Sequence, residues 1–282
     1  MPDIWGFAAI ITKFALYLGV LTAVGTVTVA LVFRLRQYKR LGLVFAVIGL
    51  VAAVLSFSLS GANLTGDASG MTDPEMVGLL WSTSVGTALL LRIVGIGLLV
   101  VGLFMGRGGL WLASFGGLVA VWSFVLVSHV STREDVILDV LLAIHLLTAA
   151  FWIGILIPLR RLTLTPATWS EAAELGHRFG IVARIALPAL VIAGGYIGYV
   201  LVGSFAALIG TGYGQGLILK VGLVAALLGL GALNKLRYIP ALQAKDPNAA
   251  GHLAKSISFE WAVIITVLGT TAVLTTNLTL PT

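Results

Sequence analysis

The chain contains eight apolar stretches, each long enough to cross a membrane as a helix. They fall at about 5–33, 41–61, 84–105, 110–130, 136–159, 179–204, 216–234 and 256–276. A helix rises about 1.5 Å per residue, so roughly 20 apolar residues span a hydrocarbon layer of about 30 Å. Helices are required because backbone polar groups in lipid must be hydrogen-bonded within the protein. The sequence therefore predicts an all-α, polytopic membrane protein with eight transmembrane helices in a lipid bilayer.

The composition agrees with this prediction. Of 282 residues, 59% are hydrophobic and only 10% are charged, against roughly 25% charged residues in a soluble domain. Cysteine is absent from the sequence, which excludes disulfides, zinc–thiolate sites and thiol catalysis. The first apolar stretch follows no basic segment and precedes no small-residue cleavage site, so we expect a retained helix rather than a signal peptide.

Basic residues concentrate in alternate connections between the apolar stretches. One set of connections carries twelve of them: Arg34, Arg36, Lys39, Arg40, Arg107, Arg160, Arg161, Arg178, Lys235, Arg237, Lys245 and Lys255. The other set carries only Arg133, beside Asp3, Asp67, Asp73, Glu75, Glu134 and Asp135. Cytoplasmic loops are enriched in Lys and Arg. The pattern predicts that the first set faces the cytoplasm and that both termini lie outside, in the periplasm.

Two segments resemble each other. TSVGTALLLR (83–92) matches TGYGQGLILK (211–220), with Arg92 aligned to Lys220. Lys13 also lies about as deep in its stretch as His145 does in its own. These matches indicate a parallel four-plus-four repeat, with one half at 1–130 and the other at 131–282. Chance similarity between apolar segments is the alternative.

Ionisable residues inside a bilayer are costly and indicate function. The candidates are Lys13, Arg92, His129, Asp139, His145, Arg184, Lys220 and Glu260. His145 lies about nine residues into its stretch, roughly 13 Å deep, with Trp152 on the same helical face. An imidazole suits copper, iron or zinc. His145 is therefore either a metal ligand or a hydrogen-bonding partner of a neighbouring helix.

The outer end of the predicted protein offers further ligands. With a hairpin turn near 131–135, His129 would lie level with Asp139, and the two could form a metal site; the alternative for His129 is an interfacial position. Met71 and Met76 lie in the acidic outer loop. Their thioethers suit Cu(I), and loop packing is the alternative.

The remaining charged candidates have structural interpretations. Arg92 and Lys220 are expected to snorkel or to pair with Asp139 or with the acidic outer loop. Glu260 and Arg184 are expected near the inner boundary, where they could pair with each other. Thr168 and Glu171 have capping-box spacing, which predicts a short surface helix through 172–177.

Several function classes have no support in the sequence. It contains no Ser–His–acid set in a motif context, no HExxH and no Walker sequence, so we expect neither an enzyme nor an ATP-driven pump. No basic run is interleaved with aromatic residues, so nucleic acid is not an expected partner.

Six segments in order make the chain resemble the copper resistance protein D family of bacterial inner-membrane proteins. They are SHV (128–130), DVLLAIHLLTAAFWIGIL (139–156), HRF (177–179), TGYGQGLILK (211–220), GALNKLRYIP (231–240) and SISFEW (256–261). The resemblance implies an eight-helix protein that moves copper across the inner membrane, often beside a periplasmic CopC-like copper carrier. His129, His145 and Trp152 match family positions. The chain departs from the family by Lys13, where a histidine is common, and by Ser128 in place of a glycine.

The expected function is therefore copper transport or copper handling, with the copper ion, Cu(I) or Cu(II), as the transported substrate. We expect His129 and His145 to bind copper at successive depths, with Asp139 near the entrance. Two alternatives remain open. One is a membrane cytochrome whose b-type haem would use His129 and His145, and the other is a non-transporting copper sensor or assembly partner.

Overall fold

The computed structural model describes residues 4–128, 135–278 and 280, and every regular element in this part of the chain is a helix. Eight helical segments are long and apolar enough to cross a membrane, which confirms the predicted number by length and composition. Their helices are α1 (Ile4–Phe33), α2 (Lys39–Thr65), α4 (Ser84–Phe104), α5 (Gly109–Leu126), α6 (Val136–Thr163), α7 (Trp169–Val202), α9 (Gly212–Leu233) and α11 (Ala249–Thr276).

Short helical elements join or extend the long helices. The 3-10 helix η1 (Ala68–Met71) and α3 (Pro74–Trp81) precede α4, η3 (Pro166–Thr168) precedes α7, and α8 (Phe205–Gly210) precedes α9. A π-helical turn, η4 (Asn234–Tyr238), and α10 (Ile239–Gln243) continue α9 beyond its apolar part. With η3, one span reaches Pro166–Val202, and with η4 and α10 another reaches Gly212–Gln243; both exceed the roughly 20 residues that cross the hydrocarbon layer.

Two helices begin earlier than the hydropathy pattern predicts. Helix α7 begins at Trp169 and α11 at Ala249, because polar residues continue each helix outside the apolar stretch. The predicted separate helix through 172–177 is wrong, since these residues form the first turns of α7. The capping box is also wrong: Oγ1 of Thr168 donates to the carbonyl oxygen of Leu162 at 2.7 Å and makes no side-chain cap.

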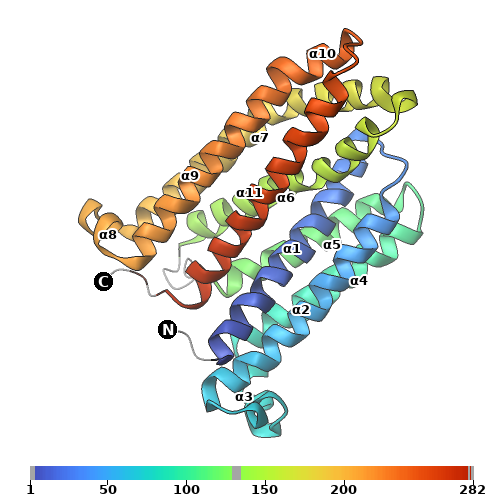
Figure 1. Cartoon of the computed structure of the whole chain (residues 1–282). Coiled ribbons are helices and arrows are strands. Elements are labelled where there is room, and N and C mark those ends of the chain that lie inside the picture. The colour runs from blue at the N-terminus through green and yellow to red at the C-terminus, as the bar shows by residue number, and fades with distance from the viewer. Residues whose placement is uncertain (1–3, 129–134, 279, 281–282) are drawn as a thin grey trace.

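Helix α1 is the central helix of the bundle. It packs against α2, α5, α6 and α11, and Figure 1 shows it between α2 on one side and α6 and α11 on the other. The burial of the spans differs widely. In an apolar segment of 18 residues within each span, 78% of the residues are buried in α1, whereas 6% are buried in the span Gly212–Gln243, which contains α9. The N-terminal helix therefore forms the core, whereas α9 lies at the periphery.

Glycines allow α1 and α6 to approach closely. A Cβ atom added to Gly25 would lie 1.8 Å from the carbonyl oxygen of Ala150, and one added to Gly154 would lie 2.1 Å from the carbonyl carbon of Gly25. Neither position has room for a side chain. Small residues at such crossings bring backbones together where lipid supplies no hydrophobic force between helices.

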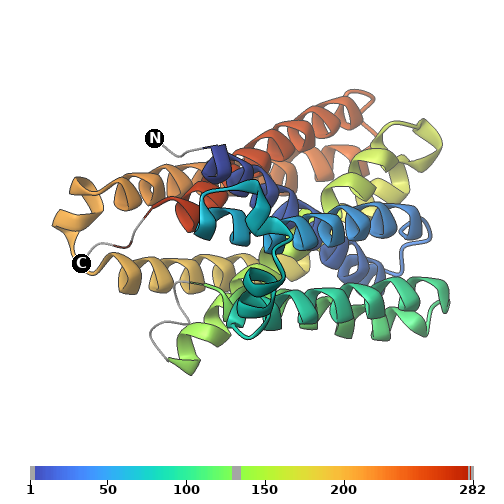
Figure 2. The ribbon, with the colours of Figure 1, turned by 90° about the horizontal axis from the view of Figure 1, so that it is seen from below.

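Different helix ends and short helices lie at the two ends of the bundle. Helix α1 starts and α11 finishes at the same end, together with α3 and α8, whereas α10 lies at the opposite end (Figures 1 and 2). An even number of crossings requires this arrangement. The assignment of the first end to the periplasm stays a prediction from the charge pattern.

The two resembling segments share a local structure. Thr83 caps α4 and Thr211 caps α9, each through its side-chain oxygen. Three residues later, Gly86 lies against the backbone at the end of α3, and Gly214 lies against the backbone of α8. The local arrangement thus recurs, while the repeat of whole halves, at 1–130 and 131–282, stays a prediction.

Candidate functional site: His145 and the buried carboxylate Glu260

His145 lies on α6 and faces α7. Its Nδ1 atom is 3.0 Å from the carbonyl oxygen of Leu190. The imidazole lies directly over Gly194, because a Cβ atom there would be 2.6 Å from Cε1 and 2.8 Å from Nδ1. A glycine on α7 thus makes the space that the ring occupies.

The hydrogen bond between His145 and Leu190 selects one tautomer of the imidazole. A carbonyl oxygen only accepts, so Nδ1 carries the proton and donates it to Leu190. In the neutral ring, Nε2 is then left with a free lone pair. Within the described part of the chain, Nε2 has no hydrogen-bonding partner. This is the arrangement that metal-binding histidines commonly adopt, with one nitrogen held by a carbonyl and the other facing the metal.

Asp139 lies six residues before His145 on α6, about 9 Å along the helix axis. Its Oδ1 atom is buried and has no hydrogen-bonding partner among the residues that the structure describes. A buried carboxylate oxygen without a donor is costly, so a bound cation would stabilise it. His129, the predicted partner of Asp139, lies outside the described residues, and the predicted pair stays a prediction.

Met71 and Met76 lie over the end of α2. Met71 ends η1, and Met76 belongs to α3 and packs against the core, with its Cγ 3.3 Å from the position of a Cβ on Gly61. Packing therefore accounts for Met76, and a role for either methionine in binding copper stays a prediction.

The same loop carries a fixed negative charge. Asp67 precedes η1, and its carboxylate accepts a hydrogen bond from the backbone N–H of Ser69 at 2.8 Å. This hydrogen bond lowers the pKa of the Asp67 carboxyl below its usual value. The loop accordingly keeps its charge under mildly acidic conditions and attracts cations to this end of the bundle.

The buried cations are held by neutral groups. Nζ of Lys13 donates to the carbonyl oxygen of Thr275 at 2.7 Å. Nε of Arg92 donates to Oγ of Ser123 at 3.0 Å, and its guanidinium lies over the ring of Phe124, 5.1 Å from the centroid. Arg92 was expected either to snorkel or to pair with an acidic group; within the described residues these contacts replace the acidic partner. The ammonium group of Lys220 is near enough to His145 to act on it electrostatically.

A polar cluster that the sequence did not predict joins α6, η4 and α11. Glu260 is 2% exposed. One of its carboxylate oxygens accepts from Nε1 of Trp152 at 2.9 Å, and the other accepts from the side-chain amide of Asn234, where the π-helical turn begins. The polar Asn234 inside an apolar stretch is the signal that could have indicated it.

The expected pairing of Glu260 with Arg184 is not observed. Because α11 begins at Ala249, Glu260 lies eleven residues into the helix, about 17 Å from its start and near its middle. Arg184 is exposed and instead lines a small cavity with His177 and Lys235. The predicted pair is therefore wrong, because in the described part of the chain Glu260 accepts hydrogen bonds from Trp152 and Asn234 instead.

Among residues 4–128, 135–278 and 280, no three His, Asp or Glu side chains form a cluster that could hold a metal ion.

Two family models match the chain. The model described as "Copper resistance protein D-like, N-terminal domain" matches residues 1–140. The model described as "Copper resistance protein D" matches residues 173–274. His145 and Trp152 lie between the two matched ranges, and Asn234 and Glu260 lie within the second.

Two curated relatives are similar to the chain. "Copper transport protein CutJ" of Bacillus subtilis (strain 168) is 30% identical over 176 residues, which cover 59% of this chain and 30% of the relative. "Inner membrane protein YebZ" of Escherichia coli (strain K12) is 30% identical over 128 residues, which cover 45% of this chain and 44% of the relative. The matches thus span less than half the length of either relative. No solved structure matches the chain.

Proposed function

The chain belongs to the copper resistance protein D family, and we propose that it carries copper ions across the bacterial inner membrane. Eight apolar helices and the likeness to an inner membrane protein support a multi-pass protein of that membrane. The likeness to a copper transport protein supports copper as the cargo. Transport, rather than chemical conversion of a substrate, is the proposed activity.

The orientation of His145 is the observation that carries this proposal. Its Nδ1 is held by Leu190, so Nε2 offers copper a lone pair in the outer half of α6. The positive charge of Lys220 nearby weakens the binding of any cation there. A weak site with a correctly oriented ligand suits an ion that must be captured and then released.

The proposed path continues along α6 toward the middle of the bundle. Trp152 lies seven residues after His145, on the same face and about 10 Å further along the helix axis. Its indole binds the Glu260 carboxylate. A cation leaving His145 would thus approach a buried acidic group, the type of group that marks ion pathways in membranes.

Copper would reach His145 from the end of the bundle that carries the acidic loop. We propose that this end faces the periplasm, with both termini, and that His129 and Asp139 receive the ion there before His145. A periplasmic CopC-like copper carrier is the proposed donor. The fixed charge of Asp67 supports this direction of approach.

The experiment measures copper uptake into proteoliposomes that contain the purified full chain. We expect His145→Ala to abolish uptake while the protein remains folded, as judged by size-exclusion chromatography. His177→Ala is the matched control, because His177 is an exposed histidine near the start of α7 and should leave uptake unchanged.

Two results would contradict the proposal. Normal copper uptake by the His145→Ala protein would show that copper does not pass by way of His145. A Soret band in the absorbance spectrum of the purified wild-type protein, lost in the His145→Ala variant, would indicate that the histidine binds haem instead of copper.

A further inference from the structure

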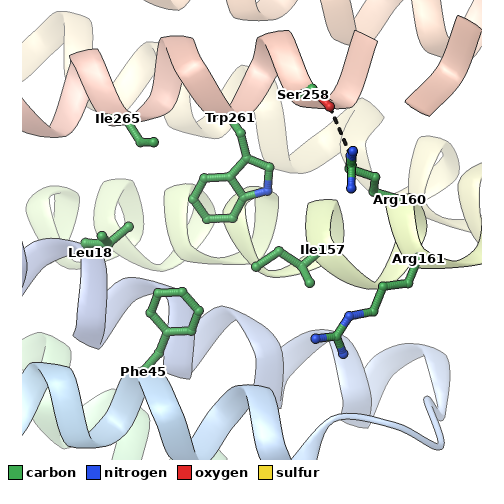
Figure 3. A pocket seen from close by; sticks show the side chains of 8 residues that line it. All are labelled: Leu18, Phe45, Ile157, Arg160, Arg161, Ser258, Trp261 and Ile265. Atoms are coloured by element: carbon green, nitrogen blue, oxygen red, sulfur yellow. Dashed lines mark hydrogen bonds between the residues drawn. The ribbon is translucent and has the colours of Figure 1, made fainter. Parts of the chain in front are cut away.

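A cleft opens between α2 and α11, away from His145. Its floor is formed by α1 and α6, and its volume is about 480 Å³. Figure 3 shows its apolar part, where Leu18, Phe45, Ile157 and Ile265 come from four different helices. These side chains offer only hydrocarbon, so this part of the cleft suits an aliphatic chain.

The other part of the cleft is basic. Arg160 and Arg161 line it from α6, and Ser258 lines it from α11 (Figure 3). Nε of Arg160 donates to Oγ of Ser258 at 2.9 Å, which fixes the guanidinium at the cleft. In the described part of the chain, neither arginine forms an ion pair with a carboxylate.

The depth of the arginines corresponds to the level of lipid headgroups. The apolar stretch at 136–159 ends immediately before Arg160, so the two guanidinium groups lie where hydrocarbon gives way to headgroups. They belong to the connections that the charge pattern assigns to the cytoplasm. The cytoplasmic leaflet contains anionic lipids, and basic pockets between helices on that side bind their headgroups.

Trp261 provides a third polar group beside the cleft. Its indole Nε1 is buried and has no hydrogen-bonding partner within residues 4–128, 135–278 and 280. Its side chain lies between the apolar part and the two arginines in Figure 3. An unsatisfied indole N–H is costly when buried, and an acceptor oxygen brought by a ligand would remove that cost.

We propose that this cleft binds one anionic phospholipid. The phosphate is held by Arg160 and Arg161, and one acyl chain lies along the apolar part toward Ile265. Ser258 and Ile265 are seven residues apart on α11, so the cleft follows the helix for about 10 Å. A free phosphate ion would use only the arginines, whereas a phospholipid fills both parts. This site lies on a different face of α6 from His145, and it does not depend on copper transport.

The test uses native mass spectrometry of the purified full chain in detergent. The protein is titrated with phosphatidylglycerol, with phosphatidylcholine carrying the same acyl chains, and with inorganic phosphate. We expect the wild type to retain one phosphatidylglycerol at a concentration at least tenfold below that needed for phosphatidylcholine, and inorganic phosphate not to displace it.

Three variants locate the site. Arg160→Gln combined with Arg161→Gln should weaken phosphatidylglycerol binding roughly tenfold to thirtyfold, since each basic residue near a membrane surface contributes to the attraction. Ile265→Trp, which fills the apolar part and keeps both charges, should also weaken it. Arg107→Gln changes an exposed arginine in the α4–α5 turn at the same end of the bundle and should bind like the wild type.

Several outcomes would overturn the proposal. Equal retention of phosphatidylglycerol and phosphatidylcholine would show that the site does not select an anionic headgroup. Displacement of the lipid by inorganic phosphate would indicate an ion site instead. Unchanged binding by the double glutamine variant, or an equal loss in Arg107→Gln, would show that the cleft is not the site. Size-exclusion profiles that match the wild type exclude misfolding as the cause of a loss.

Discussion

Replacing Gly194 by alanine tests whether the orientation of His145 matters. The new Cβ atom would lie 2.6 Å from Cε1 and 2.8 Å from Nδ1 of the imidazole. Ordinary contacts begin near 3.4 Å, so the ring must retreat by about 0.8 Å. That movement separates Nδ1 from the carbonyl oxygen of Leu190, now 3.0 Å away. The variant thus removes the group that orients the imidazole while leaving the histidine in place.

We expect Gly194→Ala to lower the affinity for copper without preventing the protein from folding. Removing the partner that orients a metal-binding histidine typically weakens metal affinity about 10- to 100-fold. We therefore expect Gly194→Ala to require at least roughly tenfold more copper for half-maximal uptake into proteoliposomes. Uptake at saturating copper should fall less, because His145 is still present.

Gly195 is the matched control. It is the next residue of α7, and a Cβ atom there would meet no heavy atom within 4 Å. Both substitutions replace glycine by alanine within one helix, so the intrinsic gain in helix propensity is the same, up to about 1 kcal/mol. Gly195→Ala should transport copper like the wild type. Equal copper dependence of the two variants would refute the inference that Leu190 orients His145.

Three further predictions concern the fold. Reporter fusions after Arg40 and after Ala68 should score as cytoplasmic and periplasmic respectively, and the reverse result would overturn the topology. Gly154→Ala should prevent α6 from packing on α1 and reduce the yield of folded protein in detergent. Gly97→Ala is the control and should not reduce the yield, because its new Cβ has no heavy atom within 4 Å. Similar yields of the two variants would contradict the close crossing of α1 and α6. Replacing Glu260 by leucine leaves the buried donors of Trp152 and Asn234 unsatisfied, at a cost of about 1–3 kcal/mol each. The melting temperature should therefore fall, and it should fall less for Glu260→Gln. Melting temperatures equal to that of the wild type would mean that the cluster does not stabilise the fold.

Hydropathy alone was sufficient to predict the eight spans. In lipid, a backbone must satisfy its own hydrogen bonds, so an apolar stretch of about 20 residues can only be a helix. The ends of the helices were less predictable. Helices α7 and α11 continue through polar residues into water, where either helix or loop is possible and only the surrounding contacts decide. The partner of Glu260 on α11 was not predictable either: Arg184 was expected, and the carboxylate accepts from Trp152 and Asn234 instead.

The chemistry of single residues could be foreseen, but their partners could not. The sequence identified His145 as an imidazole inside the membrane, and left open whether it binds metal or a neighbouring helix. The tertiary structure decided that α7 presents the carbonyl of Leu190 to one nitrogen and Gly194 to the ring. The same holds for Arg92, which was expected either to snorkel or to pair with an acidic group, and whose Nε donates to Ser123. Which helix faces which is determined by the fit of small residues such as Gly25 at the crossings, and this fit depends on three-dimensional shape rather than on local sequence pattern.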